Sequence, residues 1–251
     1  RPSHRGSATS RRGTLPAWVK GAISALDALF LFTCITALKP ARSLELGVAS
    51  GVSTAVLLRA LHHARIPLPP GHDALLSLDL HPSCYFDRTR PVGSAADEML
   101  PHLSRRVITG TTSLDVPRLV GESPLDFAFI DADHRHPWPC LDALAILPAM
   151  KPGVWLVLHD IDLPAAAKRY ESAHNTKVTW HEHGAQHLFN AWPLERFAGL
   201  GPCSNIGLVR CPQNEAEAHA LRNSLQSAIN THPWETTPPA STVATVLGAL
   251  P

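Results

Sequence analysis

The chain has 251 residues, 45% of them hydrophobic and 17% charged, a composition that excludes disorder over most of the length and permits one sizeable α/β domain. Its 22 basic and 21 acidic residues nearly cancel. Because a dedicated nucleic-acid binder carries a strong positive field, nucleic acid is not an expected partner. The five cysteines are widely spaced without a CxxC pair, which favours a reducing, cytoplasmic location.

The N-terminal part of the chain predicts a flexible tail followed by a helix. Residues 1–14 carry arginines among serine and glycine but lack the apolar centre of a signal peptide. The helix is expected over residues 15–38. Its most apolar part, residues 21–38, is interrupted by polar residues such as Asp27. This pattern suits an amphipathic helix and argues against a membrane span.

Short apolar runs alternate with helical patterns along the rest of the chain, which is typical of βα units that build a mostly parallel sheet. Two helices are expected over residues 54–63 and 214–230, and the Pro-rich residues 66–71 predict a loop. The predicted fold class is α/β: a Rossmann-like, doubly wound, seven-stranded sheet with helices on both faces and an antiparallel edge. Its strands are expected over residues 42–46, 75–78, 106–109, 125–130, 154–158, 177–180 and 206–209.

A glycine-containing turn, from Glu45 to Thr54, lies where the first strand gives way to a helix. Ligands of such sheets bind beyond the carboxyl ends of the strands, where glycine lets the backbone approach them closely. The spacing is G-x-x-x-G, unlike the G-x-G-x-x-G of dinucleotide sites, which argues against a nicotinamide-dependent oxidoreductase. Taken alone, Gly47 and Gly51 could serve only the turn.

Acidic residues end three of the predicted strands. Asp79 closes the second strand, where a carboxylate can accept the ribose hydroxyls of an adenosyl cofactor, although a solvated acid would fit there too. Asp131 and Asp160 close the fourth and fifth strands at the same edge as the glycine turn. Two buried acids at one place are compensated when they meet a cation, an ammonium group or a hydroxyl. Coordination of a divalent metal is one use of such a pair.

The motifs ELGVASGVST, SLDLH, FIDADH and KPGVWLVLHDI together resemble class I S-adenosylmethionine (SAM)-dependent methyltransferases. Within that class they are similar to a subgroup that includes macrocin-type small-molecule O-methyltransferases. The resemblance covers roughly residues 44–209. It implies a methyltransferase domain over residues 15–212, followed by a C-terminal helix and a Pro/Thr-rich tail over residues 213–251.

The resemblance also implies which residues bind SAM. The glycine turn would contact the methionine end, Asp79 the ribose, and the residues after the third strand the adenine. The full cofactor-binding set expected on this basis is Glu45, Gly47, Ala49, Ser50, Gly51, Ser53, Thr54, Asp79, Gly110, Thr111, Thr112 and Asp131.

Asp131 and Asp160 match acids that bind Mg²⁺ in metal-dependent relatives such as the caffeoyl-coenzyme A and catechol enzymes. Those relatives place asparagine after the second acid, whereas this chain has Ile161. Asp162 is the tentative replacement, so the expected metal ligands are Asp131, Asp160 and Asp162. Whether Mg²⁺ takes part is left open by the sequence.

Histidines near these acids have competing interpretations. His134 is either the base that removes a proton from the acceptor or a residue that only orients Asp131 or caps the next helix. His159 should point to the opposite face of its strand from Asp160, in a structural role. The His-x-His pattern between His181 and His187 is compatible with a metal site, but an acceptor-side or surface role is favoured.

The expected function is methyl transfer from SAM to a hydroxyl of a small-molecule acceptor, with His134, Asp131 and Asp160 as the catalytic residues. A SAM-binding protein without catalysis is the main alternative. The sequence does not identify the acceptor, and a sugar, a natural product or a phenol would each fit. A homo-oligomer is compatible with the sequence, and no membrane partner is expected.

Overall fold

A computed structural model describes residues 15–66, 74–103, 105–199, 201 and 204–248. The expected N-terminal tail, most of the Pro-rich loop, Cys203 and the last three residues lie outside the described part. None of the described helices is long and apolar enough to cross a membrane.

The centre of the fold is a seven-stranded sheet with the order β5-β2-β1-β6-β7-β9-β8. The first five strands in this order are parallel, and β9 runs antiparallel to both β7 and β8. This arrangement confirms the predicted fold class. The strands are β1 (Ser43–Leu46), β2 (Leu75–Asp79), β5 (Arg106–Thr109), β6 (Leu125–Ile130), β7 (Met150–His159), β8 (Arg196–Ala198) and β9 (Ile206–Arg210).

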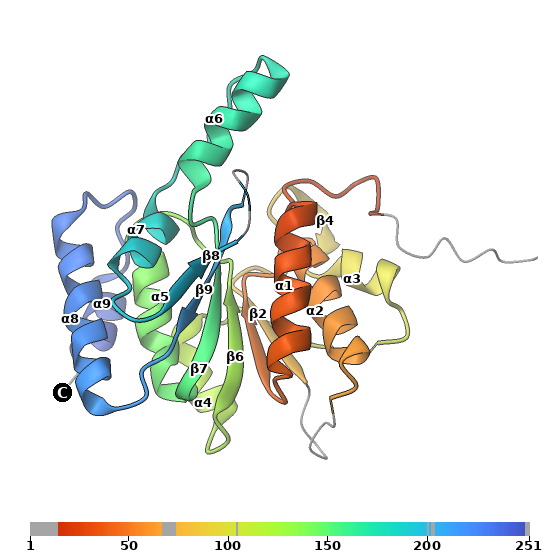
Figure 1. The fold of residues 1–251 in the computed structure, drawn as a ribbon. Helices are drawn as coiled ribbons and strands as arrows, with labels where there is room; N and C mark the ends of the chain where they lie inside the picture. Colours follow the sequence, from red (N-terminus) through yellow and green to blue (C-terminus); the bar gives the residue numbers. More distant parts are fainter. Residues whose placement is uncertain (1–14, 67–73, 104, 200, 202–203, 249–251) are drawn as a thin grey trace, which may run out of the picture.

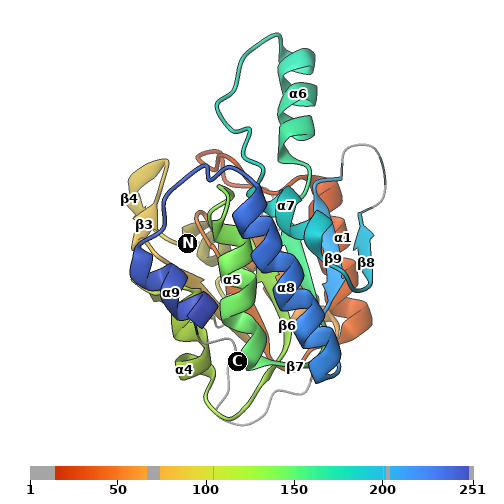
Figure 2. The same ribbon diagram turned by 90° about the vertical axis from the view of Figure 1, so that its left-hand side faces the viewer.

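Helices cover both faces of the sheet (Figures 1 and 2). On one face, Leu31 and Ile35 of the first helix pack with Leu57 of the second against Phe127 and Val157 of the sheet. The other face is covered by the helices that follow β5, β6 and β9. The helices are α1 (Ala25–Leu38), α2 (Val52–His63), α3 (Ser94–Met99), α4 (Val116–Val120), α5 (Trp138–Ile146), α6 (Leu163–His174), α7 (Gly184–Ala191), α8 (Glu215–Thr231) and α9 (Ala240–Gly248).

The first helix is shorter than predicted, because it begins at Ala25 instead of residue 15. Ser24 caps it: the hydroxyl oxygen accepts a hydrogen bond from the Asp27 backbone N–H at 3.1 Å. Before this cap the chain contains Pro16 and Gly21, and Gly21 has a positive φ of 62° that a helix does not allow. Residues 15–24 therefore form an irregular segment that passes above β4 and joins the upper end of α1 in Figure 1.

The strand predicted over residues 177–180 is wrong, and the edge strand is β8 instead. Residues 177–180 belong to the chain that returns from α6, the helix that projects from the body in Figure 1. The Val178 backbone N–H donates to the Glu171 carboxylate at 3.0 Å, and Trp180 packs edge-on against Tyr170. The apolar residues of this short run thus contact their own helix and do not pair with a strand.

A small antiparallel hairpin was not predicted. It consists of β3 (Ser83–Cys84) and β4 (Asp87–Pro91) and lies between β2 and α3. Most of its residues are polar, so it lacks the apolar alternation that identifies a strand in sequence.

Candidate active site

The glycine turn after β1 requires glycine at two positions. Gly47 has a φ of 87°, and a Cβ there would collide with the backbone oxygen of Asp131. Gly51 has a φ of 91°, and a Cβ there would lie 2.6 Å from the Cα of Gly93. Because the Asp131 N–H also donates to the Leu46 carbonyl at 2.8 Å, the ends of β1 and β6 lie side by side. The turn and the first acid therefore share one edge of the sheet.

Glu45 is fully buried at the end of β1 and accepts three side-chain hydrogen bonds. The hydroxyls of Ser53, Thr54 and Ser77 donate to its carboxylate at 2.7, 2.8 and 2.6 Å. Burial raises the pKa of Glu45 to about 7, although the three hydroxyls oppose this shift. These side chains bind one another beneath the turn. In this arrangement Glu45, Ser53 and Thr54 hold the turn in place, and their contact with a cofactor stays a prediction.

Asp79 at the end of β2 is bound to the same turn. One carboxylate oxygen accepts the N–H groups of Val48 and Ala49, both at 3.0 Å, and the other accepts the N–H of His81 at 2.8 Å. A carboxylate oxygen can accept more than one hydrogen bond, so the half-buried Asp79 retains capacity for a ligand hydroxyl. Asp79 thus holds the backbone of Ala49 in place, and Ser50 is held by the Ala95 N–H, which donates to its carbonyl.

The residues expected near the adenine follow β5. Gly110 has a positive φ of 70° and faces open space, and the Thr111 N–H approaches the Asp79 carbonyl at 3.5 Å. Thr112 forms a capping box with Asp115 at the start of a short 3₁₀ helix, Ser113–Asp115. These three residues thus lie next to the end of β2, on the same edge as the glycine turn. Their contact with a cofactor stays a prediction.

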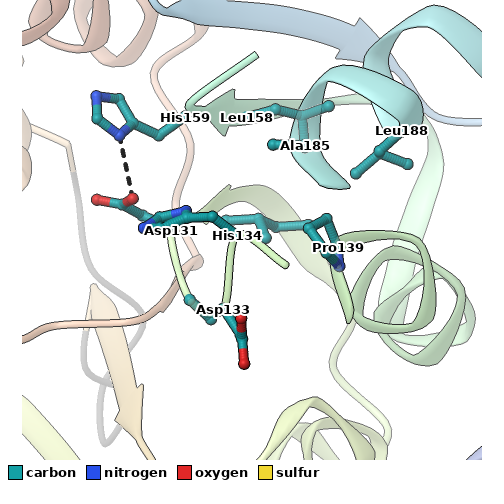
Figure 3. A pocket seen from close by; sticks show the side chains of 10 residues that line it. Asp131, Asp133, His134, Pro139, Leu158, His159, Ala185 and Leu188 are labelled. Carbon is teal, nitrogen blue, oxygen red and sulfur yellow. Dashed lines mark hydrogen bonds and ion pairs between the residues drawn. The ribbon is translucent and has the colours of Figure 1, made fainter. Parts of the chain in front are cut away.

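Asp131, His134 and Asp160 come together past the ends of β6 and β7. His134 Nδ1 lies 3.0 Å from an oxygen of Asp160, and the Asp131 carboxylate lies 3.1 Å from His159 Nδ1 (Figure 3). One ligand atom from each of Asp131, His134 and Asp160 lies within 4.8 Å of the others. The convergence inferred from sequence is therefore present in the structure, with His134 part of it.

His159 was expected to point away from Asp160, and this is wrong. Its Nδ1 lies 3.3 Å from an Asp160 oxygen, and its Nε2 lies 3.6 Å from Asp27. The reason is that Asp160 lies beyond β7 and has a left-handed φ of 59°, so strand alternation does not extend to it. His159 consequently lies among three carboxylates.

The charges in this group stabilise one another. Burial alone would lower the pKa of His159, but the Asp160 and Asp131 carboxylates outweigh it and raise that pKa well above its usual range. Burial would raise the pKa of Asp160, but His159 and His134 outweigh it and lower that pKa to about 2. At neutral pH the group therefore holds a buried imidazolium and ionised carboxylates.

Two residues of this network were missed by the sequence analysis. Asp27, in the first turn of α1, is buried and approaches His159. Asn205, just before β9, donates its side-chain N–H to Asp160 and its backbone N–H to Asp27, the latter at 3.1 Å. Asn205 thus supplies an amide beside Asp160 from a distant part of the chain. An isolated acid in an otherwise apolar helix was the one sequence feature that pointed to Asp27.

Asp162, the tentative third metal ligand, is directed elsewhere. Its carboxylate oxygens lie 3.4 Å from the Arg169 guanidinium and 3.4 Å from the Gln186 amide. Its backbone N–H is held by Asn205 at 2.8 Å. Among the described residues, the group whose ligand atoms converge includes His134 and not Asp162, so the arrangement favours His134 over Asp162 as a candidate third ligand.

Behind the acids lies a small cavity of about 10 Å³, which is close to the space needed for one water molecule. Figure 3 shows Ala185 and Leu188 of α7 on its far side, opposite Asp131 and His159. The cavity is far too small for an adenosyl group. A cofactor would therefore have to lie over the open edge formed by the strand ends.

Comparisons with known proteins agree with this fold. Residues 44–161 match the family model described as a methyltransferase domain. No curated protein matches the chain. Among solved structures, cofactor-bound Rv0187 from MTB has a TM-score of 0.53 and 19% identity, and the match covers 80% of this chain and 84% of that one.

Two further similar structures are O-methyltransferases by their descriptions. TomG from Streptomyces achromogenes, involved in tomaymycin synthesis and solved with SAM, has a TM-score of 0.50 and 19% identity over 76% of this chain and 82% of its own. The Bacillus cereus enzyme, solved with S-adenosylhomocysteine (SAH), has a TM-score of 0.50 and 22% identity over 78% and 84%. At these identities the likeness concerns the fold.

The family match covers residues 44–161, so this part of the chain is similar to a methyltransferase domain. The sheet order agrees with it, because the solved structures that share this fold include proteins bound to SAM or SAH.

Proposed function

We propose that this protein transfers a methyl group from SAM to a hydroxyl of a small molecule. The observation that carries the proposal is the meeting of the glycine turn with Asp131, His134 and Asp160 at one edge of the sheet. SAM, when bound, supplies an activated methyl group on a sulfonium. The finer assignment, to the macrocin-type O-methyltransferases, rests on the motifs of residues 126–160.

In the proposed mechanism, His134 and Asp160 act as a pair. Asp160 accepts a hydrogen bond from His134 Nδ1, which leaves Nε2 free to accept the proton of the acceptor hydroxyl. The acceptor oxygen would then take the methyl group that SAM supplies, and the electron pair of the broken carbon–sulfur bond would stay on sulfur to give SAH. The negative charge of Asp160 stabilises the imidazolium that His134 becomes.

A divalent cation fits the same residues, because two carboxylates and an imidazole converge there. Asp131 and Asp160 would hold Mg²⁺, and the ion would polarise the acceptor hydroxyl. His159 already neutralises part of the charge on both acids, so a metal would compete with it. Exhaustive chelation separates the two routes: unchanged methyl transfer contradicts a metal role, and loss restored by Mg²⁺ supports it.

The function is tested by measuring SAH formation with a panel of phenols and sugars, together with SAH binding by calorimetry. Replacing His134 with alanine should lower turnover by about 10²-fold or more, the usual contribution of a general base, with SAH affinity nearly unchanged. His174→Ala, at the exposed end of α6, is the matched control. If the wild-type protein does not bind SAH, the proposal is refuted. If it binds SAH but methylates no acceptor of the panel, a non-catalytic SAM-binding protein is favoured.

A further inference from the structure

The unpredicted hairpin of β3 and β4 lies at the same edge of the sheet as the candidate active site. Tyr85 and Phe86 form its turn, with their rings edge-on at a centroid distance of 5.0 Å. Tyr85 is 60% exposed, which is unusual for a large aromatic ring beside a buried core. The proposed methyl transfer gives this ring no role so far.

The hairpin and the start of α3, which directly follows it, are both bound to the glycine turn. The Cys84 thiol donates to the Ala49 carbonyl at 3.3 Å, and the Gly93 N–H donates to the same oxygen at 2.9 Å. The Ala95 N–H donates to the Ser50 carbonyl at 2.8 Å. Since Ala49 and Ser50 are in the expected cofactor turn, the hairpin is held in a fixed position relative to that turn.

The irregular segment before α1 holds the hairpin from the other side. Trp18 lies 6.2 Å from Phe86 between ring centroids, and the Arg90 guanidinium lies 4.2 Å above the Trp18 ring. A Cβ at Gly21 would lie 2.6 Å from the Tyr85 hydroxyl oxygen, so the hydroxyl fits only because residue 21 is glycine. The same segment leads into Asp27, which approaches His159.

Tyr85 is within electrostatic reach of the acids. Burial, and after it the charges of Asp131 and Asp160, raise the pKa of Tyr85 above its ordinary value. The hydroxyl therefore stays protonated at neutral pH and can donate a hydrogen bond. Tyr85 is thus an exposed ring with a polar tip, and its hairpin is bound to the cofactor turn at the edge of the sheet where the acids lie. These are the properties of a residue that contacts a substrate.

We propose that Tyr85 is an acceptor-binding residue, whose ring packs against a flat, uncharged ring of the acceptor and whose hydroxyl donates to an acceptor oxygen. Phe86 and Trp18 support Tyr85 from behind and do not contact the acceptor. The proposal rests on the proposed methyl transfer and narrows its acceptor to a hydroxyl carried by a planar ring, as opposed to a sugar.

The test uses two probes that differ in planarity, 2-naphthol and its saturated counterpart decahydro-2-naphthol. Binding of each is measured by calorimetry to protein saturated with SAH. We expect 2-naphthol to bind about fivefold or more tightly than the saturated probe, because only the flat ring can stack. Tyr85→Ala should weaken 2-naphthol binding about tenfold or more, and Tyr85→Phe about threefold through loss of one hydrogen bond.

Tyr170→Ala is the matched control, since Tyr170 is 44% exposed on α6. It should bind 2-naphthol as the wild type does, and all variants should keep their SAH affinity. Equal binding of 2-naphthol by wild type and Tyr85→Ala, equal binding of the two probes, or no binding of either probe would overturn the inference while SAH binding still supports methyl transfer. Failure of the wild type to bind SAH would instead overturn the proposed function and the inference with it.

Discussion

Two groups of histidines in this protein experience opposite environments. The first group lies in the candidate active site around Asp131, His134, His159 and Asp160, which we call the crevice. There the ring nitrogens of His159 lie 3.6, 3.1 and 3.3 Å from carboxylate oxygens of Asp27, Asp131 and Asp160. Around the first turns of α7, a second group consists of His136, His183, His187 and His232, and we call it the histidine stack. His187 and His232 lie face to face, 3.7 Å apart between centroids and 9° from parallel.

Neighbouring side chains decide the charge in each group. Burial, and after it the other imidazoles, lower the pKa of His187 to about 4, so His187 is neutral at pH 7. Burial likewise lowers the pKa of His136, whose ring is fully buried and edge-on to His187. In the crevice, carboxylates overcome the same desolvation and keep His159 charged. Burial therefore does not by itself predict the charge of a histidine.

The comparison also bears on the metal interpretation of residues 181–187. Imidazole lone pairs lie in the plane of the ring, so the parallel rings of His187 and His232 cannot aim at one ion in this arrangement. His183 Nδ1 is paired with Glu235 at 3.0 Å. Across the described ranges, ligand atoms converge in the crevice and not in the stack, which is consistent with the surface or acceptor-side role favoured from sequence.

The largest effect is expected from His159→Gln, which removes the cation and leaves the buried carboxylates unpaired. We expect the free energy of unfolding at pH 7 to fall by about 3 kcal/mol. Because its pKa is raised in the folded state, charged His159 stabilises the protein fully below pH 6.5, and this contribution disappears as the pH rises through the raised value. Urea denaturation at pH 7 measures the loss.

His174→Gln, an exposed histidine at the end of α6, is the control for this substitution and should unfold like the wild type. A loss for His159→Gln below about 1 kcal/mol, within the range of surface substitutions and weak pairs, would mean that the carboxylates do not depend on that cation.

A smaller effect is expected from His187→Phe, which should reduce the loss of stability at low pH instead of destabilising the protein. The unfolded chain gains a proton on residue 187 near pH 6.5, whereas the folded protein gains it only near pH 4, so stability falls as the pH drops through that window. Phenylalanine can stack on His232 without titrating. Between pH 7 and pH 4.5 the variant should therefore lose about 1 to 2 kcal/mol less than the wild type, allowing for partial solvent screening.

Thermal or urea unfolding at the two pH values measures this difference. His219→Phe on α8, outside the stack, provides the matched substitution and should leave the pH dependence as it is in the wild type. Parallel pH dependence of the wild type and His187→Phe would show that the pKa of His187 is not lowered in the folded protein.

The sequence predicted the elements whose evidence is local. Buried strands and the glycine turn have short-range patterns, so the parallel part of the sheet and the meeting of Asp131 with Asp160 followed from strand order. Asn214, expected at the start of the last long helix, caps it by accepting the Glu217 N–H at 3.0 Å. Because β6 and β7 are neighbours in the sheet, Asp131 and Asp160 meet although they are far apart in the sequence.

What the sequence could not provide depends on contacts between distant segments or on one unusual dihedral angle. Asp27 and Asn205 reach the crevice from opposite ends of the domain, and their partners are unknown until the chain is folded. His159 was misassigned because one left-handed residue interrupts the alternation of the strand. The hairpin that carries Tyr85 has too few apolar residues to be recognised as strands.

The smallest effect is expected from Asp162→Asn. Its carboxylate contacts Arg169 and Gln186 at 3.4 Å, at the base of α6, instead of the converging ligand atoms of the crevice. A weak, partly exposed pair of this kind is worth at most about 0.5 kcal/mol, and the Asn205 contact to the backbone of residue 162 is unaffected by the substitution.

Methyl transfer and its response to chelation should therefore change by less than about twofold in Asp162→Asn, whereas the matched Asp160→Asn should lose turnover by about 10²-fold or more, because His134 loses the negative charge that stabilises its imidazolium. SAH formation under saturating SAM compares the two variants directly. If Asp162→Asn instead lost activity as Asp160→Asn does, and added Mg²⁺ restored it, Asp162 would have to turn into the crevice during the reaction, and the division between crevice and surface drawn from these contacts would be wrong.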